Sequence, residues 1–238
     1  MLPDYNPVSI FVGLFSSKWV HFEPAELAGR LKSLLADFDL PPALPNVPQN
    51  APGEMPRVML LGDGKNRILE LAPKKVNLRL ICQPGQKSFD ELFEQFLGML
   101  SNVVYKVTEY EFSFNRVGII LTLFREFREN GHPVSGNQKL IDYFFQQRDI
   151  FKPTPSETQL NVHSQFDLSA EVPVNRWIRF RPLRRNPDNE DCALQVEIDL
   201  NTLPQLNRQV SLQDITDFLI LAKTHVASEI DFLSNPEF

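Results

Sequence analysis

The fold is decided by residues 88–124, which read SFDELFEQFLGMLSNVVYKVTEYEFSFNRVGIILTLF. Large apolar side chains recur in the first part at every third or fourth position, namely Phe89, Leu92, Phe93, Phe96, Leu97 and Leu100. This spacing predicts an amphipathic helix. Ser88 is placed to cap its N-terminus, and the acidic residues that follow favour the positive end of the helix dipole. Residues 110–124 alternate and then become almost continuously apolar, which predicts a long, largely buried strand.

Composition indicates a folded chain with a large core. The chain has 238 residues, of which 42% are hydrophobic and 23% charged, enough for one large domain or two closely packed ones. Its nineteen Phe, against four Tyr and two Trp, predict a core built on apolar rings. The net charge of −6 argues against a protein that binds nucleic acid with its whole surface, although a local basic patch remains compatible with it.

Two further features indicate the compartment. Cys82 and Cys192 lie in apolar runs, which favours two buried thiols in a reducing compartment over a disulfide, although both remain open. The first residues have neither the basic nor the apolar part of a secretory signal, and no apolar run approaches the ~20 residues of a membrane-spanning helix. We therefore expect a cytoplasmic protein that does not interact with membranes.

The rest of the chain predicts strands and helices in a regular order. Before residue 88 we expect strands at 8–15, 58–61, 68–71 and 76–80, and a helix that begins at Pro24. Six prolines within residues 37–56 predict an irregular surface segment, either a stiff linker or a docking loop. After residue 124 we expect a helix at 138–148 and strands at 160–168, 174–183 and 193–200. Ser211 and Asp214 predict a capping box for a last helix.

These elements fall into two series of the same order, βαβββα, at residues 1–106 and 107–238. We interpret them as two pseudo-repeats packed intimately as one unit. The predicted fold class is α+β, with a curved, mostly antiparallel sheet and the helices packed on one of its faces.

The strongest candidate for a binding surface is a run of arginines with interleaved aromatic residues at 176–185. The predicted partner-binding residues are Arg176, Trp177, Arg179, Arg181, Arg184 and Arg185. Trp177, Arg179 and Arg181 share one strand face because strands have a period of two. Such a face can stack bases and neutralise phosphates, or it can pair with carboxylates of the same sheet or of a partner protein. In a chain of net charge −6, the pairing with carboxylates is favoured.

Candidate catalytic chemistry is sparse. Glu197 and Asp199 share a strand face and could bind a cation or act as acid and base, although solvent-facing strand positions have the same pattern. None of the four histidines has a partner at metal-binding spacing, and no nucleophile or metal motif occurs. We predict no catalytic residues, no metal and no cofactor.

Several patterns together resemble a sporadically distributed bacterial protein family that has no assigned activity. They are Asn6-Pro7 before the first strand, the strand pattern at 69–80, the helix pattern from Phe89 to Leu100, Arg116-Val117-Gly118, and the late strand that ends with Asp199-Leu200. The resemblance implies a bacterial or mobile-element protein and supplies no catalytic residues.

The leading functional hypothesis is a non-catalytic protein-interaction module: an adaptor, accessory subunit or chaperone-like protein of a bacterial defence or mobile-element system. Its partner would be another protein or a second copy of the chain. The alternatives are a nucleic-acid-binding protein that uses residues 176–185 and an enzyme with a carboxylate site near Glu197 and Asp199.

Overall fold

A computed structural model describes residues 5–48, 50–129, 132–133, 135–144, 158–169, 172–183, 193–203 and 209–233. In chain order its elements are β1 (Asn6–Phe15), α1 (Pro24–Leu34), β2 (Val58–Leu61), the 3₁₀ turn η1 (Asp63–Lys65), β3 (Arg67–Ala72), β4 (Lys75–Ile81), α2 (Phe89–Thr108), β5 (Arg116–Glu126), β6 (Arg128–Glu129), β7 (His132–Pro133), α3 (Gly136–Phe144), β8 (Leu160–Asp167), β9 (Pro173–Leu183), β10 (Ala193–Thr202) and α4 (Leu212–Leu233). Helices and strands are mixed along the chain, which confirms the predicted α+β class.

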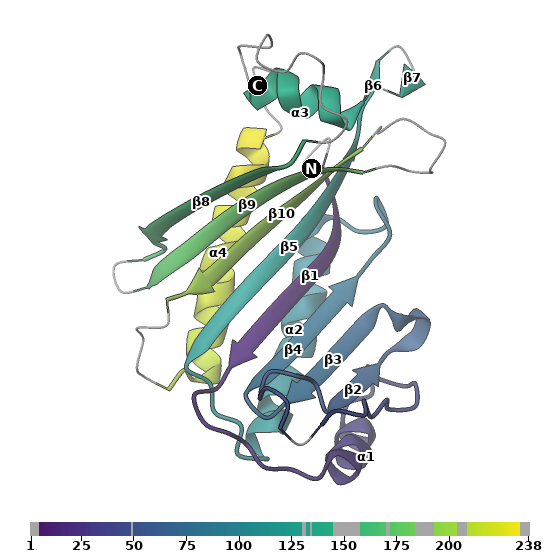
Figure 1. Ribbon diagram of the computed structural model, residues 1–238, viewed down its shortest axis with the longest axis vertical. Coiled ribbons are helices and arrows are strands. Elements are labelled where there is room, and N and C mark those ends of the chain that lie inside the picture. Colours follow the sequence, from purple (N-terminus) through teal and green to yellow (C-terminus); the bar gives the residue numbers. More distant parts are fainter. Residues whose placement is uncertain are drawn as a thin grey trace.

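One antiparallel sheet runs through the molecule. Its eight strands have the order β2-β3-β4-β1-β5-β10-β9-β8, and every neighbouring pair is antiparallel. The long helices α2 and α4 lie behind the sheet and contact each other, while α1 and α3 lie at opposite ends of the molecule (Figure 1). The sheet therefore has one face that packs on α2 and α4 and an opposite face that these helices do not cover.

The middle of the sheet is the pair β1–β5, which joins the earlier and later parts of the chain. Toward the helices, β1 presents the buried residues Ile10 and Val12. On the opposite face, Gly13 and Gly118 are direct partners across the two strands. A Cβ atom on Gly118 would lie only 2.9 Å from the Cβ atom of Asn201, so this close approach of β5 and β10 requires glycine.

The sequence predictions for α2 and α4 are confirmed. Ser88 Oγ accepts a hydrogen bond from the Glu91 N–H at 3.2 Å, and Glu91 Oε2 accepts one from the Ser88 N–H at 2.8 Å, which completes a capping box. Ser211 and Asp214 make the same reciprocal pair before α4. The predicted apolar face of α2 is buried, except that Leu97 is only partly so.

The prediction of a strand beginning at residue 110 is wrong at its N-terminal end. The N–H groups of Tyr110 and Glu111 still bond to carbonyls of the last turn of α2, and Glu111 has a positive φ of 65°. Phe112 and Phe114 are buried ahead of the strand, and β5 begins at Arg116. The alternating aromatic residues mimic a strand, but Phe112 and Phe114 fill the end of the core from the irregular segment between α2 and β5, where Phe114 forms an isolated bridge with Val210.

The Pro-rich segment forms no helix or strand among its described residues, and it lies against the edge of the sheet. The Leu40 N–H donates to the Leu61 carbonyl at 3.0 Å, and Ala43 forms an isolated antiparallel bridge with Met59 of β2. Arg57 Nη1 donates to the Pro48 carbonyl at 3.0 Å. The segment therefore covers part of the edge of β2 that would otherwise be open to pairing.

Candidate functional site: the open face of the sheet

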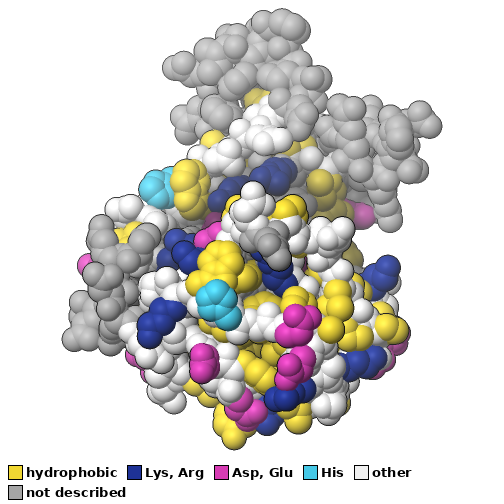
Figure 2. Space-filling view, turned by 60° about the horizontal axis from the view of Figure 1, so that its bottom comes forward, with side chains coloured by type: hydrophobic (Ala, Val, Ile, Leu, Met, Phe, Trp, Pro, Cys, Tyr) yellow, Lys and Arg dark blue, Asp and Glu magenta, His cyan; other side chains and the backbone are white. Residues whose placement is uncertain are grey.

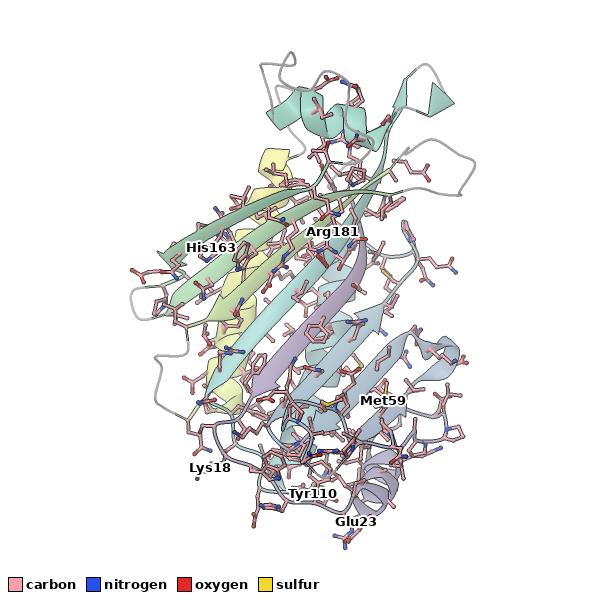
Figure 3. All side chains as sticks on the ribbon, in the orientation of Figure 1. Lys18, Glu23, Met59, Tyr110, His163 and Arg181 are labelled. Carbon is pink, nitrogen blue, oxygen red and sulfur yellow. The ribbon has the colours of Figure 1, made fainter. Side chains whose placement is uncertain are left out.

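Strand side chains alternate between the helix side and the opposite side, which we call the open face. Its aromatic side chains are the partly buried Phe11, Phe15, Phe124 and Trp177, and its cations are Lys75, Arg79, Arg116, Arg179 and Arg181. Met59 on β2 and His163 on β8 mark the two edges of this face in Figure 3. Its cations and aromatic rings come from strands far apart in the sequence.

The structure divides the predicted Arg-rich binding residues between two faces. Trp177, Arg179 and Arg181 lie together on the open face, as the strand period predicts. Arg176 lies on the helix side, where its guanidinium binds Glu229 of α4 and donates to Ser164 Oγ at 2.9 Å. Arg184 and Arg185, the other two predicted binding residues, lie outside the described residues, as does Cys192.

Carboxylates of the neighbouring strand engage both arginines of β9 on the open face. Arg179 Nη2 lies 3.0 Å from Asp199 Oδ2, and Arg181 Nη2 lies 3.6 Å from Glu197 Oε1. Asp199 Oδ1 also accepts a hydrogen bond from Asn201 Nδ2 at 2.8 Å. These contacts reduce the positive charge that β9 can offer to a ligand, and they occupy the two carboxylates that a catalytic site would need to keep free.

Trp177 does not present a bare ring face. The imidazole of His163 on β8 stacks on it with ring centroids 4.3 Å apart, and Arg179 Cζ lies 5.6 Å from its centroid. A base that stacked on Trp177 would have to displace one of these groups.

A second group of cations lies on β4 and β5, beside the phenyl rings of β1, and the sequence analysis did not single it out. Arg79, Phe11, Lys75, Phe15 and Arg116 form what we call the cation–phenyl row. Arg116 Cζ lies 3.8 Å from the centroid of Phe15, Lys75 Nζ lies 4.8 Å from the same centroid, and Arg79 Cζ lies 5.2 Å from that of Phe11.

Partial burial shapes the electrostatics of this row. Burial lowers the pKa of Lys75, opposed by the charge of Glu70 and reinforced by that of Arg116. Burial also lowers the pKa of Arg116, opposed by the charge of Asp199. Both cations therefore sit where the charged form is less well solvated than in water, and a nearby anion would stabilise it.

Other candidate groups are scattered. In the part of the chain that the structure describes, no group of three or more His, Cys, Asp and Glu side chains is placed to hold a metal ion. Cys82 is free and partly buried; its Sγ lies 3.0 Å from the Pro7 carbonyl, and burial raises the pKa of its thiol. His225 lies under the sheet against Phe166, with ring centroids 4.7 Å apart.

The face shown in Figure 2 is mixed in charge. With the lower end of Figure 1 turned forward, Lys and Arg side chains lie among hydrophobic and acidic ones and form no single continuous positive field (Figure 2). A continuous positive field is what a protein needs to bind long stretches of nucleic acid backbone.

Neither the protein-family models nor the curated proteins include a match to this chain. Among the described helices, none is both long and apolar enough to cross a membrane.

Proposed function

We propose that this chain is a non-catalytic protein-interaction module, an adaptor, accessory subunit or chaperone-like protein that docks a partner protein on the open face. The observation that carries this proposal is a broad sheet face that α2 and α4 leave uncovered and that bears aromatic rings and arginines of partial exposure. Trp and Arg are enriched among the residues that contribute most to protein–protein binding. Carboxylate pairing along β9 and β10 further supports a protein partner, because it leaves a polar but nearly neutral surface there.

We also propose that the eight-stranded sheet arose by internal duplication of a βαβββα unit. It is supported by the element order, because β1-α1-β2-β3-β4-α2 is followed by β5, α3, β8, β9, β10 and α4, apart from the short β6 and β7. The order of the sheet supports it too. Outward from the β1–β5 pair, one side continues as β4, β3 and β2, and the other as β10, β9 and β8.

Affinity purification of the tagged full chain from its native host tests the proposal. We expect a partner, identified by mass spectrometry and then reconstituted from purified components, to bind the wild-type chain. The double variant Trp177→Ala, Arg179→Ala should lose most of this binding, because it removes an aromatic anchor and its cation from the open face.

Tyr105→Ala is the matched control, since Tyr105 is 60% exposed on α2, which packs on the other side of the sheet. If the two variants have equal thermal stability, the loss of binding in the double variant is not caused by unfolding. If the purified partner binds the double variant as tightly as the wild-type chain, the partner does not use this face and the proposal fails.

A further inference from the structure

The cation–phenyl row differs from the rest of the open face in how its charges are satisfied. Among the described residues, no carboxylate lies within ion-pair distance of Lys75, Arg79 or Arg116. The carboxylates whose charges act on Lys75 and Arg116 lie beyond ion-pair distance: Glu70 and Glu54 act on Lys75, and Asp199 acts on Arg116. Glu70 accepts a hydrogen bond from Asn77 Nδ2 at 2.8 Å, and Asp199 binds Arg179. Three cations therefore rest on two phenyl rings without a direct ion pair to any described carboxylate.

The row is also held in place before any ligand arrives. Phe15 lies across Gly13 of its own strand, because a Cβ atom on Gly13 would meet the ring at 3.2 Å. Arg116 Cζ lies 3.8 Å from the centroid of that ring, a cation–π contact that holds the guanidinium against Phe15. The Nε atom of Arg116 is buried and has no hydrogen-bond partner. A guanidinium held on a ring by a cation–π contact still has N–H groups at its terminal nitrogens that can donate to a carboxylate.

We infer that the cation–phenyl row binds carboxylates of a short acidic segment in the partner protein, an inference that rests on the proposed function of the open face. Three cations within one row match closely spaced Asp or Glu side chains of such a segment. Partial burial strengthens each charge–charge contact relative to one in open water.

The geometry favours an acidic peptide over a single-stranded nucleic acid. Nucleic-acid platforms stack bases on open aromatic faces, whereas cations occupy the faces of Phe11 and Phe15. A polynucleotide would also extend its phosphates beyond the row and over a chain of net charge −6. A short peptide segment engages the row alone.

Fluorescence anisotropy with defined probes tests this inference on the full chain. The probes are a fluorescein-labelled peptide of about ten residues that alternates Glu and Leu, the same peptide with Gln for Glu, and a labelled oligothymidine. At a physiological ionic strength of about 0.15 M, we expect the Glu peptide to bind and the Gln peptide not to bind. Lys75→Gln, Arg116→Gln should weaken binding of the Glu peptide by about tenfold or more.

A control variant and a further variant of the row separate local recognition from effects of overall charge and of folding. Arg30→Gln, Lys106→Gln makes the same change in charge on α1 and α2 and should leave the affinity unchanged. Arg79→Gln removes an exposed cation of the row without disturbing the core and should also weaken binding. In an independent measurement without mutation, the Glu peptide should slow acetylation of the Lys75 amine, followed by mass spectrometry.

Several results would overturn the inference. They are equal binding of the Glu and Gln peptides, no binding of the Glu peptide, an equal loss of affinity in the Arg30, Lys106 control, and tighter binding of oligothymidine through the same residues. Failure of this inference leaves the proposed function standing if a reconstituted partner still depends on Trp177 and Arg179. In that case the cation–phenyl row does not bind acidic segments, but the open face still docks the partner.

Discussion

Arg176 and Arg179 show how a single position in a strand decides what a side chain does. They are three residues apart in β9 and therefore point to opposite sides of the sheet. Arg179 pairs with Asp199 on the open face, while Arg176 pairs with Glu229 beneath the sheet and lies over the ring of Phe166, with Cζ 5.5 Å from its centroid. One residue belongs to the proposed docking surface and the other fastens α4 to the sheet.

The Arg176–Glu229 contact predicts a specific dependence of stability on pH. His225 Nε2, 3.3 Å from Glu229 Oε1, and the Arg176 guanidinium hold the pKa of Glu229 below its ordinary value of 4.5. Because the folded-state pKa is lowered, this carboxylate stabilises the fold above pH ~4.5, and the contribution is lost as the pH falls through the lowered pKa. Glu229→Gln should therefore reduce the free energy of unfolding by about 1–3 kcal/mol at neutral pH.

Urea unfolding of both proteins between about pH 3 and pH 7 measures this effect. The difference in unfolding free energy between wild type and Glu229→Gln should shrink toward the acid end. Asp231→Asn makes the same change in charge at an exposed position of α4 and should show a small difference at every pH. A Glu229→Gln difference that stayed constant with pH would contradict the assigned ion pair.

At the level of elements, α2 is the best specified part of the chain. Its N-terminus is fixed by the reciprocal Ser88 and Glu91 hydrogen bonds, and its buried side chains lie along one stripe. Gly98 lies in the helix interior, where a Cβ atom would meet nothing within 4 Å. The helix therefore has one residue that stabilises it through its cap and one that weakens it through backbone entropy.

Two substitutions in α2 should accordingly have effects of opposite sign. Ser88→Ala removes the cap and should lower the free energy of unfolding by about 1 kcal/mol. Gly98→Ala should raise it by about 0.5–1 kcal/mol, because alanine loses less backbone entropy in a helix. Midpoints of urea unfolding measure both, with Gly29→Ala in α1, also free of steric neighbours, as the parallel case. A destabilising Gly98→Ala would show that this helix face is not open.

The Pro-rich segment shows an element whose role depends on its neighbours. Its composition predicts irregular backbone, which the structure has, but composition cannot say where that backbone lies. Hydrogen bonds from Leu40 and Ala43 place it along β2. Because β2 has only four residues and one paired neighbour in the sheet, this cover protects an edge that could otherwise pair with another chain.

At the scale of the whole molecule, the earlier and later parts of the chain share one sheet, in which β1 pairs with β5. The β1–β5 pair has a long antiparallel register from Asn6–Phe124 to Phe15–Arg116, with one irregularity between Pro7 and Ser9. α2 and α4 add a second connection, since Lys223 Nζ lies 2.9 Å from Asp90 Oδ1 and 3.2 Å from Glu94 Oε1. Neither part can leave the other without exposing core from both.

We therefore predict that the molecule unfolds in one cooperative transition. Trp19 precedes α1 and Trp177 lies in β9, so the variants Trp19→Phe and Trp177→Phe each retain one fluorescent reporter, in different parts of the chain. Urea transitions followed by each tryptophan and by circular dichroism should coincide within each variant. Separate midpoints for the tryptophan signal and the circular dichroism signal would show that the two parts unfold independently.

The sequence by itself determined the fold class, most element positions, the N-cap at Ser88, the capping box of Ser211 and Asp214, and the shared face of Trp177, Arg179 and Arg181. These features depend on contacts between residues near one another in the chain, where helix and strand periods are visible directly. Tertiary structure alone decided that β5 begins at Arg116, that Arg179 and Arg181 meet carboxylates, and that Lys75, Arg79 and Arg116 gather on two phenyl rings. Those outcomes require strands β4, β1, β5, β10 and β9 to be neighbours, and strand order is set by packing of the entire core, which no local pattern records.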